Sequence, residues 1–100
     1  MKAPIVSLIE IVQKLRSPTG CPWNKAQDLL SIRPYLLEET FELLEVLDQT
    51  KLDHNGTKNQ HLCEELGDLL FVILLLAQIS EDENRYQRSM FFSRYSKNDC

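Results

Sequence analysis

The sequence predicts an all-α protein, an antiparallel helical bundle. Apolar residues recur at intervals of three and four in several segments, no segment alternates in the manner of a β-strand, and prolines and glycines gather between the periodic segments. With 100 residues, 43% of them hydrophobic and 26% charged, the chain fits one globular domain.

The first helix is expected over residues 4–15. Proline is tolerated in a first helical turn, and the aliphatic residues that follow Pro4 fall on one face: Ile5, Leu8, Ile9, Val12 and Leu15. The segment RSPTGCPWN then ends the helix, because it holds prolines and a glycine in close succession. Asn24 is expected to cap a short helical turn over residues 25–31.

Two longer helices follow. Pro34 is well placed as the first residue of a second helix that runs to about residue 49. A polar stretch containing His54 and Gly56 forms the next turn. The third helix is expected over about residues 60–80, and its almost wholly apolar sequence after Asp68 predicts burial on most sides.

The C-terminal segment beyond Asp82 carries aromatic and basic residues without a clear period. We interpret residues 87–100 as a divergent, frayed tail and residues 1–86 as the folded domain.

Composition limits the partners and the compartment. A net charge of −4 provides no overall positive field for nucleic acid, so no stable nucleic-acid binding is expected. The three cysteines show no CxxC spacing, which favours reduced thiols over a zinc site or a disulfide framework. The longest apolar run, residues 69–77, is too short to cross a bilayer, and no secretory signal is evident. The expected location is the cytoplasm.

Two pairs of acids carry the candidate chemistry. Glu39 and Glu42 are three residues apart on the second predicted helix, and Glu65 and Asp68 have the same spacing on the third. A spacing of three places both side chains of a pair on one helix face. The two pairs are symmetric about the predicted turn, so antiparallel helices would bring them to the same level.

Four carboxylates in one small volume must bind protons or cations. Because the ligands are hard oxygens, the arrangement favours Mg²⁺, with Mn²⁺ as an alternative, and Mg²⁺ in proteins commonly also binds substrate phosphates. The neighbouring Glu38 and Glu64 are candidates for indirect metal contacts or for a base that accepts a proton from water. The alternative is a solvated acidic helix face, because Glu is common on surface helices and anions are favoured in the first halves of helices.

Three segments in order resemble the MazG family of nucleoside triphosphate pyrophosphohydrolases. They are LRSPTGCPWNKAQ (15–27), PYLLEETFELLEVL (34–47) and EELGDLLF (64–71), and the resemblance covers roughly residues 5–86. It implies an all-α bundle, usually a homodimer or larger, that uses Mg²⁺ to hydrolyse nucleoside triphosphates to the monophosphate and pyrophosphate.

The resemblance also implies roles for individual residues. Glu39, Glu42, Glu65 and Asp68 would be metal ligands, and Glu38 would have an auxiliary catalytic role. Trp23 would stack on the base and Lys25 would meet a phosphate. An alternative for Trp23 is simple packing at the end of the bundle.

Several positions depart from the family pattern. Asn24 stands where Asp is common, Gln27-Asp28 replaces Gln-Thr, and Val72 and Leu76 replace polar residues. The usual basic segment at the C-terminal end is also not recognisable. These departures support a second hypothesis, a weakly active or inactive homologue that acts as a self-association or protein-interaction module. A third is a different phosphate-ester hydrolase that uses the same metal site.

Overall fold

The computed structural model describes residues 2–49, 59–85, 90 and 93–94. Its helices in chain order are α1 (Pro4–Leu15), α2 (Pro22–Lys25), α3 (Leu29–Gln49) and α4 (Asn59–Asp82). The described part of the chain contains no β-strand, which confirms the all-α class.

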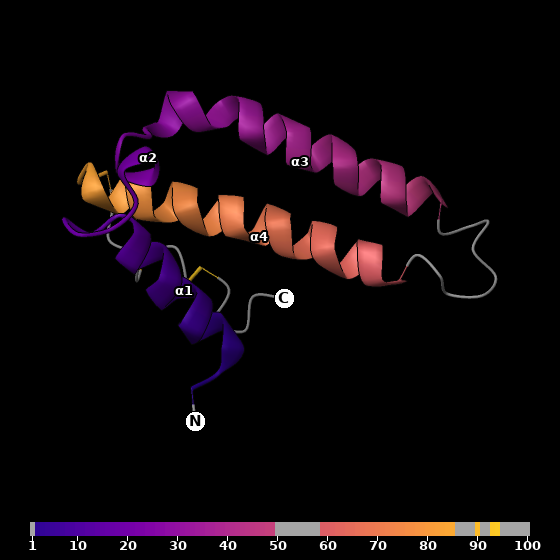
Figure 1. Ribbon diagram of the computed structural model, residues 1–100, viewed down its shortest axis with the longest axis horizontal. Coiled ribbons are helices and arrows are strands. Elements are labelled where there is room, and N and C mark those ends of the chain that lie inside the picture. The colour runs from indigo at the N-terminus through magenta and orange to yellow at the C-terminus, as the bar shows by residue number, and fades with distance from the viewer. Residues whose placement is uncertain (1, 50–58, 86–89, 91–92, 95–100) are drawn as a thin grey trace.

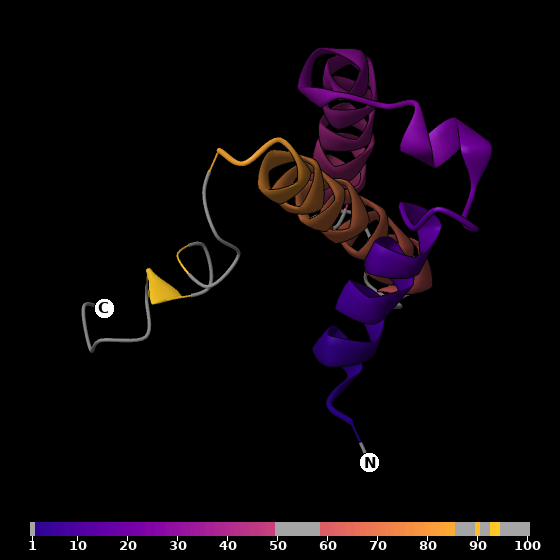
Figure 2. The same cartoon turned by 90° about the vertical axis from the view of Figure 1, so that its left-hand side faces the viewer.

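The two long helices, α3 and α4, run antiparallel and side by side (Figure 1). Helix α1 packs mainly against α4, so that α4 lies between α1 and α3 (Figure 2). The predicted turn with His54 and Gly56 lies outside the described residues, as does nearly all of the predicted tail.

Helix α1 has the predicted bounds, and the loop after it turns back sharply. The amide of Cys21 donates to the carbonyl oxygen of Leu15 at 2.9 Å. A Cβ at Gly20 would lie 2.2 Å from the carbonyl oxygen of Lys14, so only glycine fits this approach. The loop is therefore packed against the end of α1 by its own backbone.

The predicted helical turn over residues 25–31 is wrong. Helix α2 instead spans Pro22–Lys25, with Cys21 at its N-cap. The ring of Pro22 presets a helical φ at the first position, which explains the earlier start. Asn24 lies inside this turn and is only 3% exposed, so it is not a cap.

The predicted start of the second long helix at Pro34 is also wrong, because α3 begins at Leu29. Asp28 caps it reciprocally with Ser31: Oδ1 of Asp28 accepts from the Ser31 amide, and Oγ of Ser31 accepts from the Asp28 amide, both at 2.8 Å. Pro34 consequently lies inside the helix, where it has no amide hydrogen for the carbonyl of Leu30.

The hydrophobic core joins α1 to the two long helices. Its buried side chains come from α1, α3 and α4: Val12, Ile32, Val72, Leu74, Leu75 and Ile79. Burying side chains of this size stabilises the fold by about 1.5–3 kcal/mol each before entropy is counted.

Helix α4 lies within two residues of its predicted bounds, 60–80, and most of its apolar half is buried as expected. Leu66, Leu70 and Ile73 are exceptions, with exposures of 51%, 38% and 37%. None of the helices described here is long and apolar enough to cross a membrane.

Candidate metal centre and adjoining pocket

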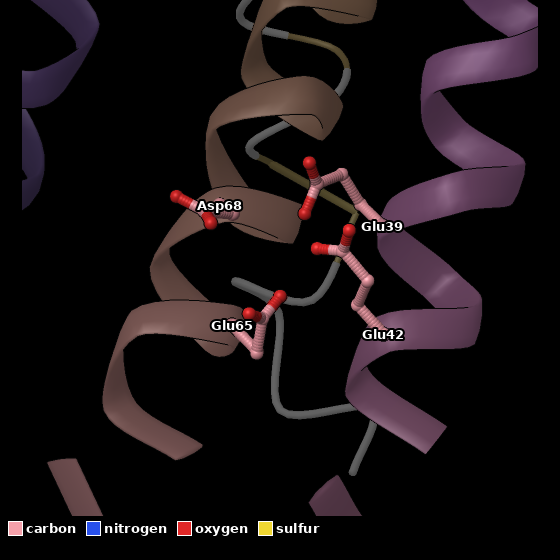
Figure 3. A group of neighbouring side chains, drawn as sticks. All are labelled: Glu39, Glu42, Glu65 and Asp68. Carbon is pink, nitrogen blue, oxygen red and sulfur yellow. The ribbon is translucent and has the colours of Figure 1, made fainter. Parts of the chain in front are cut away.

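Four acidic side chains meet between α3 and α4. One carboxylate oxygen from each residue lies within 4.8 Å of the other three: Glu39, Glu42, Glu65 and Asp68. Figure 3 shows the two glutamates of α3 directed toward Glu65 and Asp68 of α4. The three-residue spacing in each helix and the antiparallel packing therefore bring together the carboxylates that the sequence singled out.

Parts of this group are withdrawn from solvent. Glu65 is only 7% exposed, and Oε2 of Glu65 and Oε2 of Glu39 are buried without a hydrogen-bond partner in the described part of the chain. The other oxygen of Glu65 lies 3.3 Å from Nε2 of His61. A buried carboxylate oxygen without a donor is costly when it is charged, so both oxygens favour binding of a positive ligand.

The same crowding changes the proton affinity of the site. Burial, followed by repulsion from Glu42 and Asp68, raises the pKa of Glu39 from 4.5 to about 7. The pKa of Glu65 is raised as well, first by burial and then by its contact with Glu42. Without a cation the group thus retains protons at a pH where isolated carboxyl groups have lost them.

A divalent cation fits this set of donors. All four ligand atoms are carboxylate oxygens, and within the described residues no histidine or cysteine belongs to the group. Hard oxygen donors suit Mg²⁺ or Mn²⁺ better than zinc or copper. A cation would neutralise the repulsion between the carboxylates that raises their proton affinity. It would also supply a partner for the two buried oxygens, Oε2 of Glu39 and Oε2 of Glu65.

The adjacent acids Glu38 and Glu64 do not join the group. Both side chains are exposed, and Oε1 of Glu64 accepts a hydrogen bond from Nε2 of Gln60 at 3.3 Å. Their auxiliary roles stay predictions.

A pocket of about 230 Å³ adjoins the acidic group and shares two of its residues. Its lining is otherwise almost entirely aromatic and aliphatic: Trp23, Ile32, Tyr35, Glu39, Asp68, Phe71, Val72 and Leu75. The rings of Trp23 and Tyr35 meet edge to face, with centroids 5.3 Å apart. This volume is below the range of about 300–1,000 Å³ typical of whole drug-sized ligands, so it suits one flat ring system.

Sequence reasoning singled out Trp23 but missed Tyr35 and Phe71. Both could have been found from their spacing, since Tyr35 precedes Glu39 by four residues and Phe71 follows Asp68 by three. Each therefore lies one helical turn from an acid of the group, on the same face.

Lys25 is directed toward its own loop in this structure. Its Nζ donates to the carbonyl oxygen of Pro18 at 2.7 Å. A role for Lys25 at a phosphate stays a prediction, and it would require this hydrogen bond to be exchanged.

The fold and the site define a class of protein: an all-α bundle in which two antiparallel helices form a carboxylate centre beside an aromatic pocket. Residues 27–97 match the MazG nucleotide pyrophosphohydrolase domain. The chain belongs to this family, whose named members are hydrolases.

Curated relatives agree with this assignment. The chain is 46% identical over 76 residues to the uncharacterized protein YabN of Bacillus subtilis, covering 76% of this chain and 14% of YabN. It is 42% identical over 80 residues to a nucleoside triphosphate pyrophosphohydrolase of Escherichia coli, covering 79% of this chain and 28% of that protein.

A pyrophosphohydrolase of Thermotoga maritima is 40% identical over 80 residues, with the same two coverages of 79% and 28%. The chain thus spans less than a third of these relatives. No solved structure matches it.

Proposed function

We propose that this chain hydrolyses nucleoside triphosphates to the nucleoside monophosphate and pyrophosphate in a reaction that depends on Mg²⁺. The observation that carries the proposal is the group of four carboxylates beside a ring-sized aromatic pocket. One substrate with a flat base and a charged triphosphate would match both parts. The family and the names of the relatives supply the reaction type.

The carboxylates of Glu39, Glu42, Glu65 and Asp68 would hold the cation, for which Mn²⁺ is the alternative. When bound, the cation would neutralise negative charge on the triphosphate and on the departing pyrophosphate. The rings of Trp23, Tyr35 and Phe71 would bind the face of the base and exclude water from it.

Two further residues have proposed roles in the reaction. Glu38 would accept a proton from the attacking water as an exposed general base. Lys25 would contact a phosphate after leaving the Pro18 carbonyl. Both assignments come from the positions of these residues in the family motifs.

Pyrophosphate release from a panel of nucleoside triphosphates, with and without Mg²⁺, tests the proposal. We expect release only with the divalent ion, and we expect Glu42→Ala to abolish it because a central ligand is lost. Glu45→Ala is the matched control, since Glu45 is exposed on the same helix and outside the carboxylate group. Absence of pyrophosphate at high protein concentration would refute the activity, and orthophosphate instead would indicate a different phosphate-ester hydrolase.

We also propose that the protein forms a homodimer through exposed apolar side chains of α3 and α4. They are Leu37 and Leu44 on α3, and Leu66, Leu70 and Ile73 on α4. These five side chains are 37–59% exposed, and a second copy would cover them to form a four-helix arrangement.

Sedimentation velocity tests the dimer. Leu70→Glu should yield a monomer, because the charge would be buried at the interface. Ile11→Glu on α1 is the matched control, since Ile11 is 53% exposed but lies on another helix. A monomeric wild type would contradict the dimer. A dimer that neither binds Mg²⁺ nor releases pyrophosphate would instead favour the alternative function, a self-association or protein-interaction module.

The remaining proposals concern the surroundings of the protein. We propose a cytoplasmic location, which agrees with the free thiols of Cys21 and Cys63. The absence of stable nucleic-acid binding stays a prediction from the net charge of −4.

A further inference from the structure

Arg16 connects three segments of the protein at the end of α1. Its side chain is only 10% exposed. Nε pairs with Oδ2 of Asp82, at the end of α4, at 2.8 Å. Nη1 donates to the carbonyl oxygens of Asn24 and of Gln27, the latter at 3.3 Å. One guanidinium therefore ties α1 to the last residue of α4 and to the backbone of the loop around α2.

This loop carries Trp23, and Arg16 binds the carbonyl of the very next residue. Gln27, the second residue that Arg16 contacts, returns a hydrogen bond to Trp23: its Nε2 donates to the Trp23 carbonyl at 2.9 Å. Gln27 is held in turn by Oγ of Ser31, which donates to Oε1 at 2.7 Å. The backbone of Trp23 is thus fixed through partners that Arg16 secures.

The indole of Trp23 depends on this backbone support. Its side chain is 48% exposed, and its described ring contact is the edge-to-face pair with Tyr35, which is itself 41% exposed. Burial alone does not define where the ring lies. An indole on the pocket wall therefore takes its position largely from the peptide that carries it.

We propose that Arg16 is a positioning residue that holds Trp23 in place as a wall of the pocket beside the carboxylates. Arginine suits this role because its planar guanidinium offers several donors in fixed directions, whereas a lysine ammonium has one nitrogen at the end of a flexible stem. Lysine keeps the charge, but its three donors share a single nitrogen, which cannot occupy both the position of Nε beside Asp82 and that of Nη1 beside the two carbonyls. The effect of Arg16 on nucleotide binding rests on the proposed function; its effect on Trp23 does not.

The first test uses Trp23 as a reporter, since it is the one tryptophan in the sequence. We expect Arg16→Lys to shift the fluorescence emission to longer wavelength, to weaken the near-ultraviolet circular dichroism of the indole, and to increase quenching by acrylamide. Arg85→Lys is the matched control: Arg85 pairs with Glu83 at 3.0 Å, but its side chain is 61% exposed. The control should leave all three signals unchanged.

The second test separates positioning from a general loss of structure. Arg16→Lys should raise the KM for nucleoside triphosphates about five- to tenfold with little change in kcat, a size expected when a charge-assisted contact is weakened. Inhibition by inorganic tripolyphosphate, which has no base, should not change. If Arg16→Lys does not fold, Asp82→Asn provides the comparison, because it removes the charge opposite Arg16 while keeping one oxygen that can still accept the hydrogen bond from Gln78. It should cause the same changes to a smaller degree.

Unchanged tryptophan signals in a folded Arg16→Lys protein would overturn the proposal. So would equal weakening of nucleotide and tripolyphosphate binding together with a lower Tm, because that pattern indicates a purely structural role. If wild-type protein releases no pyrophosphate at all, the proposed function fails, and the fluorescence comparison still decides the positioning role.

Discussion

The raised proton affinity of the carboxylate group makes Glu39→Gln a sensitive test of the site. Glutamine has nearly the same shape as glutamate but carries no charge. In the metal-free protein at pH 8, the change should therefore stabilise the fold, although it removes a proposed ligand. Addition of Mg²⁺ should then stabilise the wild type and have little effect on the variant.

The expected gain in the free energy of unfolding follows from the pKa of Glu39, which rises from 4.5 to about 7 in the folded protein. At about 1.36 kcal/mol per pH unit this corresponds to at most about 3.4 kcal/mol. Because the side chain is half-buried, solvent screening reduces the value, and we expect about 1–2 kcal/mol.

The pH dependence has a definite sign. Between pH 4.5 and about 7 the folded state binds more protons at Glu39 than the unfolded state does. The stability that protonated Glu39 contributes to the wild type is therefore lost as the pH rises through that window. The advantage of Glu39→Gln should accordingly be small at pH 4.5 and complete above pH 7.

Urea denaturation and thermal melting with a chelator present, at pH 4.5 and at pH 8, measure this effect. A gain of 1–2 kcal/mol corresponds to a rise in Tm of at least about 4 °C in a domain of this size. Glu45→Gln is the control, since Glu45 is exposed on the same helix and outside the group. If Glu39→Gln destabilises the metal-free protein at pH 8, or if the control gains as much, the repulsion inferred between the carboxylates is wrong.

Three further changes test the fold around the site. Asp28→Ala removes the cap of α3 and should lower the free energy of unfolding, measured by urea denaturation, by about 1 kcal/mol. Asp28→Asn should retain most of the stability that the cap contributes. Gly20→Ala places a methyl group against the Lys14 carbonyl and should lower Tm by several degrees, while Ala26→Gly in the same loop provides a comparison without that clash. Pro34→Ala restores the amide that α3 lacks and should raise the unfolding free energy by about 1 kcal/mol or more; no gain would mean that the helix already accommodates the ring.

Periodicity predicted the long elements of the fold well. The bounds of α1 followed from the helical spacing of its apolar residues, and those of α4 nearly followed from its almost continuous apolar run. The meeting of the two acidic pairs followed from their equal spacing and from the symmetric positions of the pairs about the connection. Such features depend only on residues close in sequence and on one antiparallel contact.

Local capping explains the errors. Pro34 carries a strong signal for a helix start, but the reciprocal bonds of Asp28 and Ser31 begin the helix one and a half turns earlier. The contact between Trp23 and Tyr35 was harder to predict than the residues themselves, because it depends on a loop held by tertiary contacts from Arg16. Hydrogen bonds between side chains and distant segments produce no periodic pattern in a sequence.

The two halves of the candidate site have separate origins in the chain. The carboxylates all lie within thirty residues, on α3 and α4. Among the described residues that line the pocket, Trp23 is the one from outside these two helices, and it belongs to the loop around α2. Exchange of the loop could therefore change which molecules bind in the pocket without altering the carboxylate group. In evolution or in engineering, selectivity and reactivity would be free to diverge at different rates.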